Sequence, residues 1–309
     1  MENETSLEQK IYNAQSIGNV EPIEFMIPYP SMRSLIEGQN IKYSEQKIIE
    51  KPYTTNLDFY NYIQKTANWL QSLDAKPKDI IIIPKLAYPQ SEIILYGIWQ
   101  LGAVALLPGK TQLIEIKKQI KNMIEIDNSI NLFDEIKSFS NKYKPKYKPN
   151  LSENALITFE TGVGIKLSHY NLLINASGIQ KTLDLKSNTK YYSNLNPTSS
   201  SWAIFQAILP IYSGSVFNKK DPEITIGKNN CFYNLRFDYE NIHHFNKNEF
   251  AICAENTAAL SLGGNPIHLT EFSLQKNTLN IKGHSVMMGY LDKRLNEERF
   301  NKDSLSVKF

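Results

Sequence analysis

The sequence predicts a mixed α/β fold in which short buried strands alternate with helices. In residues 54–108, apolar side chains recur at helical spacing, then form an unbroken run, and then repeat this order. Further strand and helix patterns follow residue 155. We therefore expect mixed sheets flanked by helices, arranged as two α/β lobes that meet across a cleft.

The first predicted helix begins at Thr55 or Asn56, because either side chain can accept from a free N–H group of the first turn. Apolar residues then define one buried helical face: Tyr60, Ile63, Ala67 and Leu70. Residues 75–79 end this helix, and the β-branched run 80–83 predicts a strand buried on both faces.

A second helix and strand complete this unit. Pro89 suits a first helical turn, residues 93–101 are apolar enough for a buried helix, and Gly102 suits its end. Residues 104–107 form the next predicted strand. Consecutive strands joined by a helix should be parallel, with a right-handed crossover.

A polar segment separates the two predicted lobes. Residues 113–139 are rich in helix formers, and lysine, tyrosine and proline alternate in the stretch that follows. The prolines exclude a helix there, so residues 141–152 predict an extended linker between lobes 1–140 and 153–309. Interleaved lysine and tyrosine could contact a nucleic acid strand, but the stretch is short and isolated.

The second lobe begins with a predicted strand at 155–159, a loop at 160–167, and a helix capped by Ser168. Further along, short strands at 191–194 and 215–217 flank an apolar helix at 202–209. Residues 271–274 and 278–281 predict a hairpin with a polar turn.

Composition excludes several classes of protein. The chain has 309 residues, of which 41% are hydrophobic, and a net charge of +3 with its lysines spread out, so it does not suggest a nucleic-acid binder. The apolar runs are too short for a membrane span, and the N-terminus does not resemble a signal peptide. We expect a cytoplasmic protein in which Cys231 and Cys253 are reduced, partly buried thiols.

The best candidate for chemistry is the segment from Ala155 to Gly178, a strand that opens into a loop before a helix. The loop contains Thr161, Gly162 and Gly164. Glycine lets backbone N–H groups approach a phosphate closely, and threonine adds a hydroxyl donor. Taken alone, the loop fits either a phosphate site or a plain turn.

Four stretches, in order, resemble the adenylate-forming (AMP-dependent synthetase/ligase) superfamily, which includes acyl-CoA synthetases. They are residues 55–108, with Leu-Gly-Ala-Val-Ala-Leu-Leu-Pro at 101–108; 155–173, around the loop; Ala-Ile-Cys-Ala-Glu at 251–255; and Gly-His-Ser-Val-Met-Met-Gly-Tyr-Leu at 283–291. The resemblance implies the N-terminal region of an acyl-CoA synthetase-like fold. It also implies carboxylate activation with ATP and Mg²⁺.

The loop departs from the family pattern T-S-G-T-T-G-x-P-K-G. Thr161-Gly162 matches Ser-Gly, whereas the Pro-Lys-Gly part is absent and Lys166 matches a variable position. The chain also stops where relatives have Thr-Gly-Asp, so we expect the C-terminal domain and its lysine to be absent. The resemblance therefore leaves Thr161, Gly162 and Gly164 as residual nucleotide-binding residues, with no assignable catalytic residue.

Glu255 matches the acidic residue that resembles a magnesium ligand in the family's Tyr-Gly-x-Thr-Glu motif. Ala251 replaces the tyrosine that would stack on adenine, and Ala254 replaces the threonine. A surface carboxylate without an ion is the alternative interpretation of Glu255.

Two histidine features have structural explanations. His169 matches a position that orders the helix start, although its titration range would also suit a general base. The adjacent pair His243-His244 lacks a neighbouring carboxylate or thiolate cluster in the sequence, so we expect an ordinary loop pair.

The sequence leaves two main functional hypotheses. The first is a pseudoenzyme that keeps the scaffold and binds a protein partner, a carboxylic acid ligand or a nucleotide. The alternative is an active carboxylate–CoA or carboxylate–AMP ligase, completed by a separate C-terminal half and using ATP and Mg²⁺. Nucleic acid binding would depend on the lysine–tyrosine linker alone.

Overall fold

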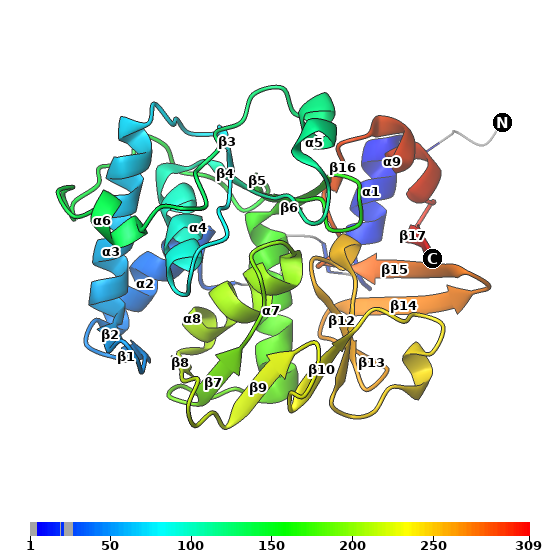
Figure 1. Ribbon diagram of the computed structural model, residues 1–309. Helices are drawn as coiled ribbons and strands as arrows, with labels where there is room; N and C mark the ends of the chain where they lie inside the picture. The colour runs from blue at the N-terminus through cyan, green and yellow to red at the C-terminus, as the bar shows by residue number, and fades with distance from the viewer. Residues whose placement is uncertain (1–4, 19, 22–26) are drawn as a thin grey trace.

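The computed structural model describes residues 5–18, 20–21 and 27–309 of the chain (Figure 1). Within these residues the strands form a central sheet of five strands, a large sheet of nine and a small sheet of three. The described helices are α1 (Leu7–Gln15), α2 (Met32–Tyr43), α3 (Asn56–Ser72), α4 (Gln90–Leu101), α5 (Leu113–Gln119), α6 (Leu132–Glu135), α7 (His169–Leu183), α8 (Leu209–Ser213) and α9 (Lys293–Arg299).

The central sheet has the order β16-β6-β5-β4-β3. Its strands are β3 (Ile80–Ile82), β4 (Val104–Leu107), β5 (Asn154–Thr158), β6 (Ile165–Ser168) and β16 (Gly289–Tyr290). Strands β3, β4 and β5 are parallel neighbours, which confirms the predicted parallel pair on either side of α4. Strand β6 turns back antiparallel to β5 and then pairs antiparallel with β16.

The large sheet has the order β13-β12-β11-β10-β9-β7-β8-β1-β2. Its strands are β1 (Lys47–Ile49), β2 (Thr54–Thr55), β7 (Lys190–Ser193), β8 (Val216–Phe217), β9 (Ile224–Gly227), β10 (Tyr233–Arg236), β11 (Glu249–Ile252), β12 (Ala259–Leu262) and β13 (Asn265–Pro266). Neighbouring strands from β1 through β8, β7, β9 and β10 to β11 are parallel, so their carboxyl ends share one edge.

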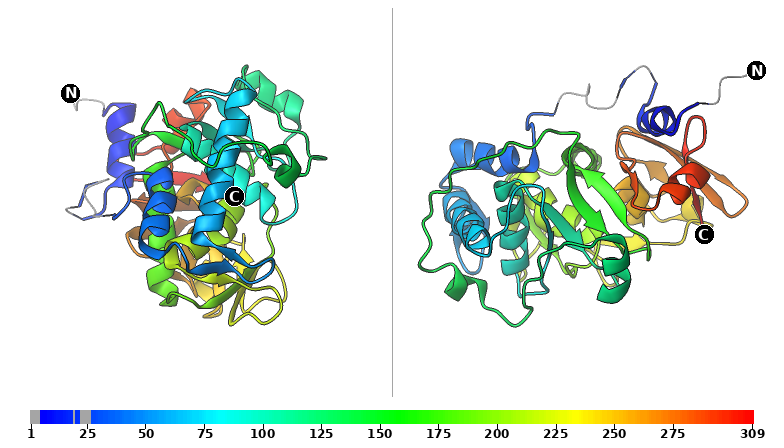
Figure 2. Two further views of the ribbon diagram at one scale, coloured as in Figure 1. Left: turned by 90° about the vertical axis from the view of Figure 1, so that its left-hand side faces the viewer. Right: turned by 90° about the horizontal axis from the view of Figure 1, so that it is seen from above.

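The small sheet consists of β14 (Thr270–Gln275), β15 (Thr278–Gly283) and β17 (Leu305–Lys308). Strands β14 and β15 pair antiparallel up to Gln275 and Thr278, which confirms the predicted hairpin. Seen from above, this sheet lies with α1 and α9 at the opposite end of the molecule from α2 and α3 (Figure 2).

The first predicted helix–strand unit is confirmed in detail. Thr55 is the N-cap of α3, in a capping box with Asp58, and Ile63, Ala67 and Leu70 on its predicted face are buried, while Tyr60 is half-buried. Helix α4 ends at Gly102, whose φ of 85° suits glycine.

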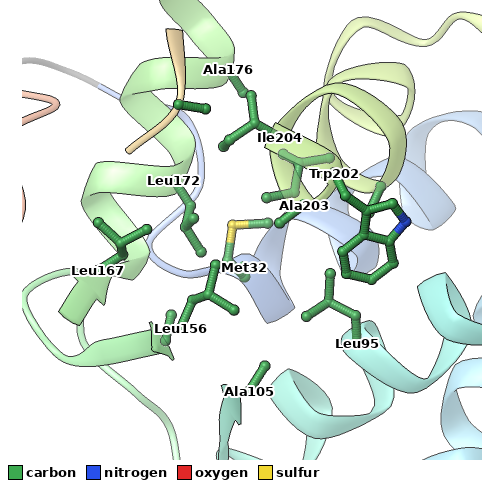
Figure 3. Packing of buried hydrophobic residues seen from close by; sticks show 14 of the residues in the cluster. Met32, Leu95, Ala105, Leu156, Leu167, Leu172, Ala176, Trp202, Ala203 and Ile204 are labelled. Atoms are coloured by element: carbon green, nitrogen blue, oxygen red, sulfur yellow. The ribbon is translucent and has the colours of Figure 1, made fainter. Parts of the chain in front are cut away.

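The main core lies between the central sheet and the helices that cover it. Met32 of α2 and Leu95 of α4 point toward Leu156 of β5 and Leu172 of α7 (Figure 3). Trp202 closes this group and is fully buried, as are its labelled neighbours. The core therefore joins elements from both sides of the 141–152 segment.

Several predicted elements are wrong in type or extent. The 160–167 stretch is not all loop, because residues 165–168 form β6, in which Ile165 and Leu167 face the core. The 113–139 stretch holds only the short helices α5 and α6. The predicted 202–209 helix is a π-helix, Trp202–Ile208, that continues into α8. Strand β3, predicted to be buried on both faces, lies at the end of its sheet, and Ile80 and Ile82 are partly exposed.

Strands from both predicted lobes share two of the sheets. The central sheet combines β3 and β4 with β5, β6 and β16, and β1 pairs with β8 in the large sheet. The division into lobes 1–140 and 153–309 stays a prediction, and these shared sheets argue against separate folding units. Among the described helices, none is both long and apolar enough to cross a membrane.

Candidate active site

The turn at residues 159–164 joins β5 to β6 and has two glycines with different roles. Gly162 has a φ of 89° and an exposed position, so it gives the turn its left-handed backbone. Gly164 is buried, and a Cβ atom there would lie 2.3 Å from Leu291 Cδ1. The sequence pattern therefore marks one turn glycine and one packing glycine.

The turn has backbone donors available to a ligand. Thr161 is exposed, and among the described residues neither its N–H group nor that of Val163 donates to a protein acceptor. Two such donors could bind water or an anion. Hydrogen bonds hold both ends of the turn: Thr111 Oγ1 donates to Phe159 O at 3.1 Å, and Leu291 N donates to Gly164 O at 2.8 Å.

Glu255 is buried, with 4% of its surface exposed, so the surface-carboxylate interpretation is wrong. Tyr290 OH donates to its Oε1 and Cys253 Sγ donates to its Oε2, both at 3.3 Å. Burial raises the pKa of the Glu255 carboxyl above its ordinary value, against the opposing effect of these hydrogen bonds.

Glu160 is a second acidic residue at this site, which the sequence analysis did not identify. Its Oε2 accepts from Ser200 N at 2.5 Å. Burial raises the pKa of Glu160 to about 7, and the nearby Glu255 adds to this increase, whereas Lys228 opposes it. Glu160 directly precedes Thr161-Gly162, and its carboxyl, held by Ser200 N, adds negative charge to this site once the pH exceeds about 7.

Backbone hydrogen bonds join three of the four resembling stretches. Met287 N donates to Glu255 O, and Met288 N donates to Lys166 O, each at 2.9 Å. Residues 287–291 therefore bridge the motif at 251–255 and the β5–β6 hairpin. This arrangement brings Glu255 to the same site as the turn, although the two lie almost a hundred residues apart in the sequence.

Asn175 of α7 holds the segment after Glu255. Its side chain is fully buried and donates to Asn256 O at 3.2 Å and Ala259 O at 2.9 Å. It also accepts from Ala259 N at 3.1 Å. Thr257 in this segment has a φ of 69°, which few residues with a Cβ adopt. Such a backbone conformation is unfavourable by itself, so contacts such as those of Asn175 must stabilise it.

Comparison with known proteins identifies the fold. No family model matches the chain, and no curated protein matches its sequence. The anthranilate CoA ligase AuaEII, solved in complex with anthranoyl-AMP, is similar in structure with a TM-score of 0.73 and 12% identity, covering 91% of this chain and 74% of that chain. The NpsA N-terminal subdomain from Klebsiella oxytoca gives a TM-score of 0.70 and 14% identity, covering 91% and 96%.

The chain has the fold of the N-terminal region of adenylate-forming enzymes. The O-succinylbenzoate coenzyme A synthetase MenE from Bacillus subtilis agrees, with a TM-score of 0.70 and 12% identity, covering 88% of this chain and 75% of that one. These matches confirm the predicted acyl-CoA synthetase-like fold. At such identities they establish architecture alone.

Ala251 and Ala254 are both buried in this fold. A methyl side chain provides neither a ring that could stack on adenine nor a hydroxyl group. The described residues do not form a favourable magnesium site either. Both oxygens of Glu255 already accept hydrogen bonds, and the pKa values of Glu160 and Glu255 are raised, whereas a metal ligand must be deprotonated. The magnesium role of Glu255 stays a prediction.

The structure places His169 at the start of α7, where its ring binds the first turn of α2, and places His243 and His244 on the surface. His169 is buried, and its Nδ1 accepts from Met32 N at 3.3 Å. Burial lowers the pKa of His169 to about 4, which stabilises the neutral ring. His243 and His244 are exposed in a short 3₁₀ turn, and His243 stacks on Phe272 with ring centroids 5.8 Å apart. In the described ranges, no three His, Cys, Asp or Glu side chains gather as metal ligands.

A cavity of about 390 Å³ opens beside this site at the carboxyl ends of β7 and β9. Its wall includes Thr198, Ser199 and Lys228. Lys228 is also the cation that opposes the raised pKa of Glu160. Ligands of α/β sheets commonly bind at the carboxyl ends of parallel strands. The small cavity therefore lies near Glu160, because its wall residue Ser199 precedes Ser200, which donates to the Glu160 carboxyl.

Proposed function

We propose that this chain is a ligand-binding protein with the adenylate-forming fold whose adenylation activity is lost or strongly reduced. Adenylation requires a carboxylate to attack the α-phosphate of ATP while pyrophosphate leaves. Negative charge on the phosphate oxygens must then be stabilised by donors and cations positioned in advance. The proposal depends on whether the 159–164 turn can provide that stabilisation.

One observation supports the proposal most strongly: the turn brings two carboxyl groups, Glu160 and Glu255, close enough to interact electrostatically. A bound triphosphate would face two acidic groups, which supply no positive charge when neutral and repel the phosphates when ionised above about pH 7. Lys228 is the nearby cation that acts on Glu160. Removal of one preorganised donor from an active site commonly costs 10²–10³ in rate, so this combined change should leave little activity.

The fold suggests the chemical class of the ligand or partner but not its identity. AuaEII binds anthranoyl-AMP and MenE binds AMP in their own structures. A carboxylic acid or a nucleotide is therefore the natural small-molecule candidate for this chain, with Thr161, Gly162 and Gly164 as the residual nucleotide-binding residues. A protein partner is the remaining candidate, since one structural neighbour is an artificially fused adenylation–PCP di-domain.

The alternative function is an active carboxylate–CoA or carboxylate–AMP ligase that uses ATP and Mg²⁺ together with a separate C-terminal half. The free N–H groups of Thr161 and Val163 favour it, because such donors suit a phosphate group. Neither the acidic turn nor the buried Ala251 would be changed by adding a second polypeptide. We therefore place this function second.

ATP–pyrophosphate exchange with a panel of aliphatic, aromatic and amino acids tests the proposal. We expect exchange no faster than a reaction without protein, with MenE as the positive control. Acid-dependent exchange above background would contradict the proposal and favour the ligase. The same assay with Glu160→Thr removes the added negative charge and shows whether that carboxyl is the main obstacle.

A further inference from the structure

A cavity with a volume of about 1280 Å³ lies away from the 159–164 turn. It opens between the β1–β2 turn, the β3–α4 loop and the carboxyl ends of β7 and β8. It shares Tyr192 and residues 194–196 with the smaller cavity, and none of residues 159–164 lines it. Cavities of 300–1,000 Å³ already hold drug-sized ligands, so this one has room for a small molecule.

Lysines from four separate chain segments surround this cavity. They are Lys47, Lys51, Lys85, Lys190, Lys219 and Lys220. Lys47 pairs with Glu50 at 2.6 Å and Lys190 with Asp221 at 2.8 Å, while the other four make no ion pair with any described residue. Three carboxyl groups also line the cavity, so its net charge is positive and attracts an anion.

Two buried polar atoms in the cavity wall lack a partner among the described residues. Glu92 is 3% exposed, and its Oε1 accepts from Trp202 Nε1 at 2.9 Å and from Gln206 Nε2 at 2.7 Å, whereas its Oε2 has no partner. Ser193 is 2% exposed and its hydroxyl is also unpaired. Other buried side-chain atoms of the described residues also lack a partner, but these two belong to residues of the cavity wall, where a polar group of a ligand can pair with them.

Glu92 is fixed by a π-helix. Trp202 and Gln206 both lie on the 202–208 π-helix, and their side chains hold one carboxyl oxygen while leaving the other toward the cavity. Isolated π-helical turns occur frequently at functional sites. Burial raises the pKa of Glu92, so a ligand hydroxyl, which can both donate and accept, suits this carboxyl in either protonation state.

Aromatic rings form the apolar part of the wall. Tyr88 stacks on Phe217 with ring centroids 3.8 Å apart and planes 17° apart, and Tyr192 meets Phe217 edge-on at 5.5 Å. These rings provide a flat apolar surface between the lysines and the buried carboxyl. The cavity therefore combines positive charge, an aromatic surface and unpaired polar atoms.

We propose that this cavity binds a small phosphorylated molecule with a ring and a hydroxyl group. Its phosphate faces the lysines, its ring lies on the aromatic wall, and its hydroxyl pairs with Glu92 Oε2 and Ser193 Oγ. A phosphate ester is favoured over a single carboxylate because its greater charge matches several lysines. The inference deepens the proposed ligand-binding role, and it can fail while the loss of adenylation stands.

Calorimetric titration tests the proposal with two probes, pyridoxine 5′-phosphate and 4-(hydroxymethyl)phenyl phosphate, each compared with its unphosphorylated parent. We expect both phosphates to bind and both parents to bind at least about tenfold more weakly at physiological salt. The triple variant Lys51→Gln/Lys85→Gln/Lys219→Gln should also weaken phosphate binding about tenfold. The matched control is Lys144→Gln/Lys146→Gln/Lys148→Gln, which removes three exposed lysines outside the cavity and should leave binding unchanged.

Acetylation footprinting then locates the bound probe. Bound pyridoxine 5′-phosphate should slow acetylation of Lys51, Lys85 and Lys219 but not that of the control lysines. The proposal is overturned if neither phosphate binds at 10 mM, if the parents bind equally well, or if both triple variants behave alike. ATP–pyrophosphate exchange measures adenylation and not phosphate binding in this cavity. Failure of the cavity proposal can therefore be told apart from failure of the proposed loss of adenylation.

Discussion

Replacing Asn175 with alanine lowers the free energy of unfolding by about 3 kcal/mol, because one fully buried side chain loses three hydrogen bonds. The amide joins α7 to Asn256 and Ala259 on the segment that follows Glu255. The two carbonyl groups keep other partners, from Ala258 N and Asn256 Nδ2. The Ala259 N–H group loses its side-chain acceptor, and a small cavity is left beside it.

Urea unfolding measures this effect, with Asn229→Ala as the matched control. Asn229 is exposed, and its side chain has no hydrogen-bond partner among the described residues, so its replacement should change stability by less than about 0.5 kcal/mol. A loss below about 1 kcal/mol for Asn175→Ala would show that the turn after Glu255 does not depend on this side chain.

Replacing Glu160 with glutamine stabilises the protein at pH 8 by on the order of 2–3 kcal/mol and has little effect near pH 4. The pKa of Glu160 is raised from 4.5 to about 7, so the folded state binds a proton that the unfolded state has already lost. The wild-type protein therefore loses stability as the pH rises from about 4.5 through 7. Glutamine has no proton to lose and keeps the neutral hydrogen-bonding group.

The measurement is the difference in unfolding free energy between Glu160→Gln and wild type across pH 4 to 8. Depression of the His169 pKa to about 4 acts in the opposite direction at acidic pH, but it is common to both proteins and cancels. Glu271→Gln, at an exposed position on β14, is the control and should give a nearly flat difference. A flat difference for Glu160→Gln would show that its carboxyl is not desolvated by the site.

Local sequence patterns predicted the elements whose causes are local. Helix α3 begins at Thr55 because of its own capping box, and the β14–β15 hairpin follows from alternation around a short polar turn. Strand β6 was missed because it is only four residues long and lies directly against the glycine-containing turn. Its pairing with β16, more than a hundred residues further along, is not visible in a local pattern.

The site was predicted in part, from a resemblance rather than from periodicity. Glu255 could be singled out, but its burial depends on Cys253 and on Tyr290, which comes from a distant stretch. Glu160 was overlooked because a carboxylate in a phosphate-type loop has no obvious role until Glu255 is placed beside it. The lysine-lined cavity could not be predicted, since four separated segments form it.

We propose that the 159–164 turn occupies the position of a nucleotide loop while its acidic groups oppose a bound triphosphate. Calorimetric titration of the chain with MgATP tests this claim directly. We expect a dissociation constant weaker than about 1 mM, corresponding to less than about 4 kcal/mol of binding free energy. A dissociation constant below about 50 μM that is weakened by Gly162→Val would contradict the claim and show that the turn still binds ATP.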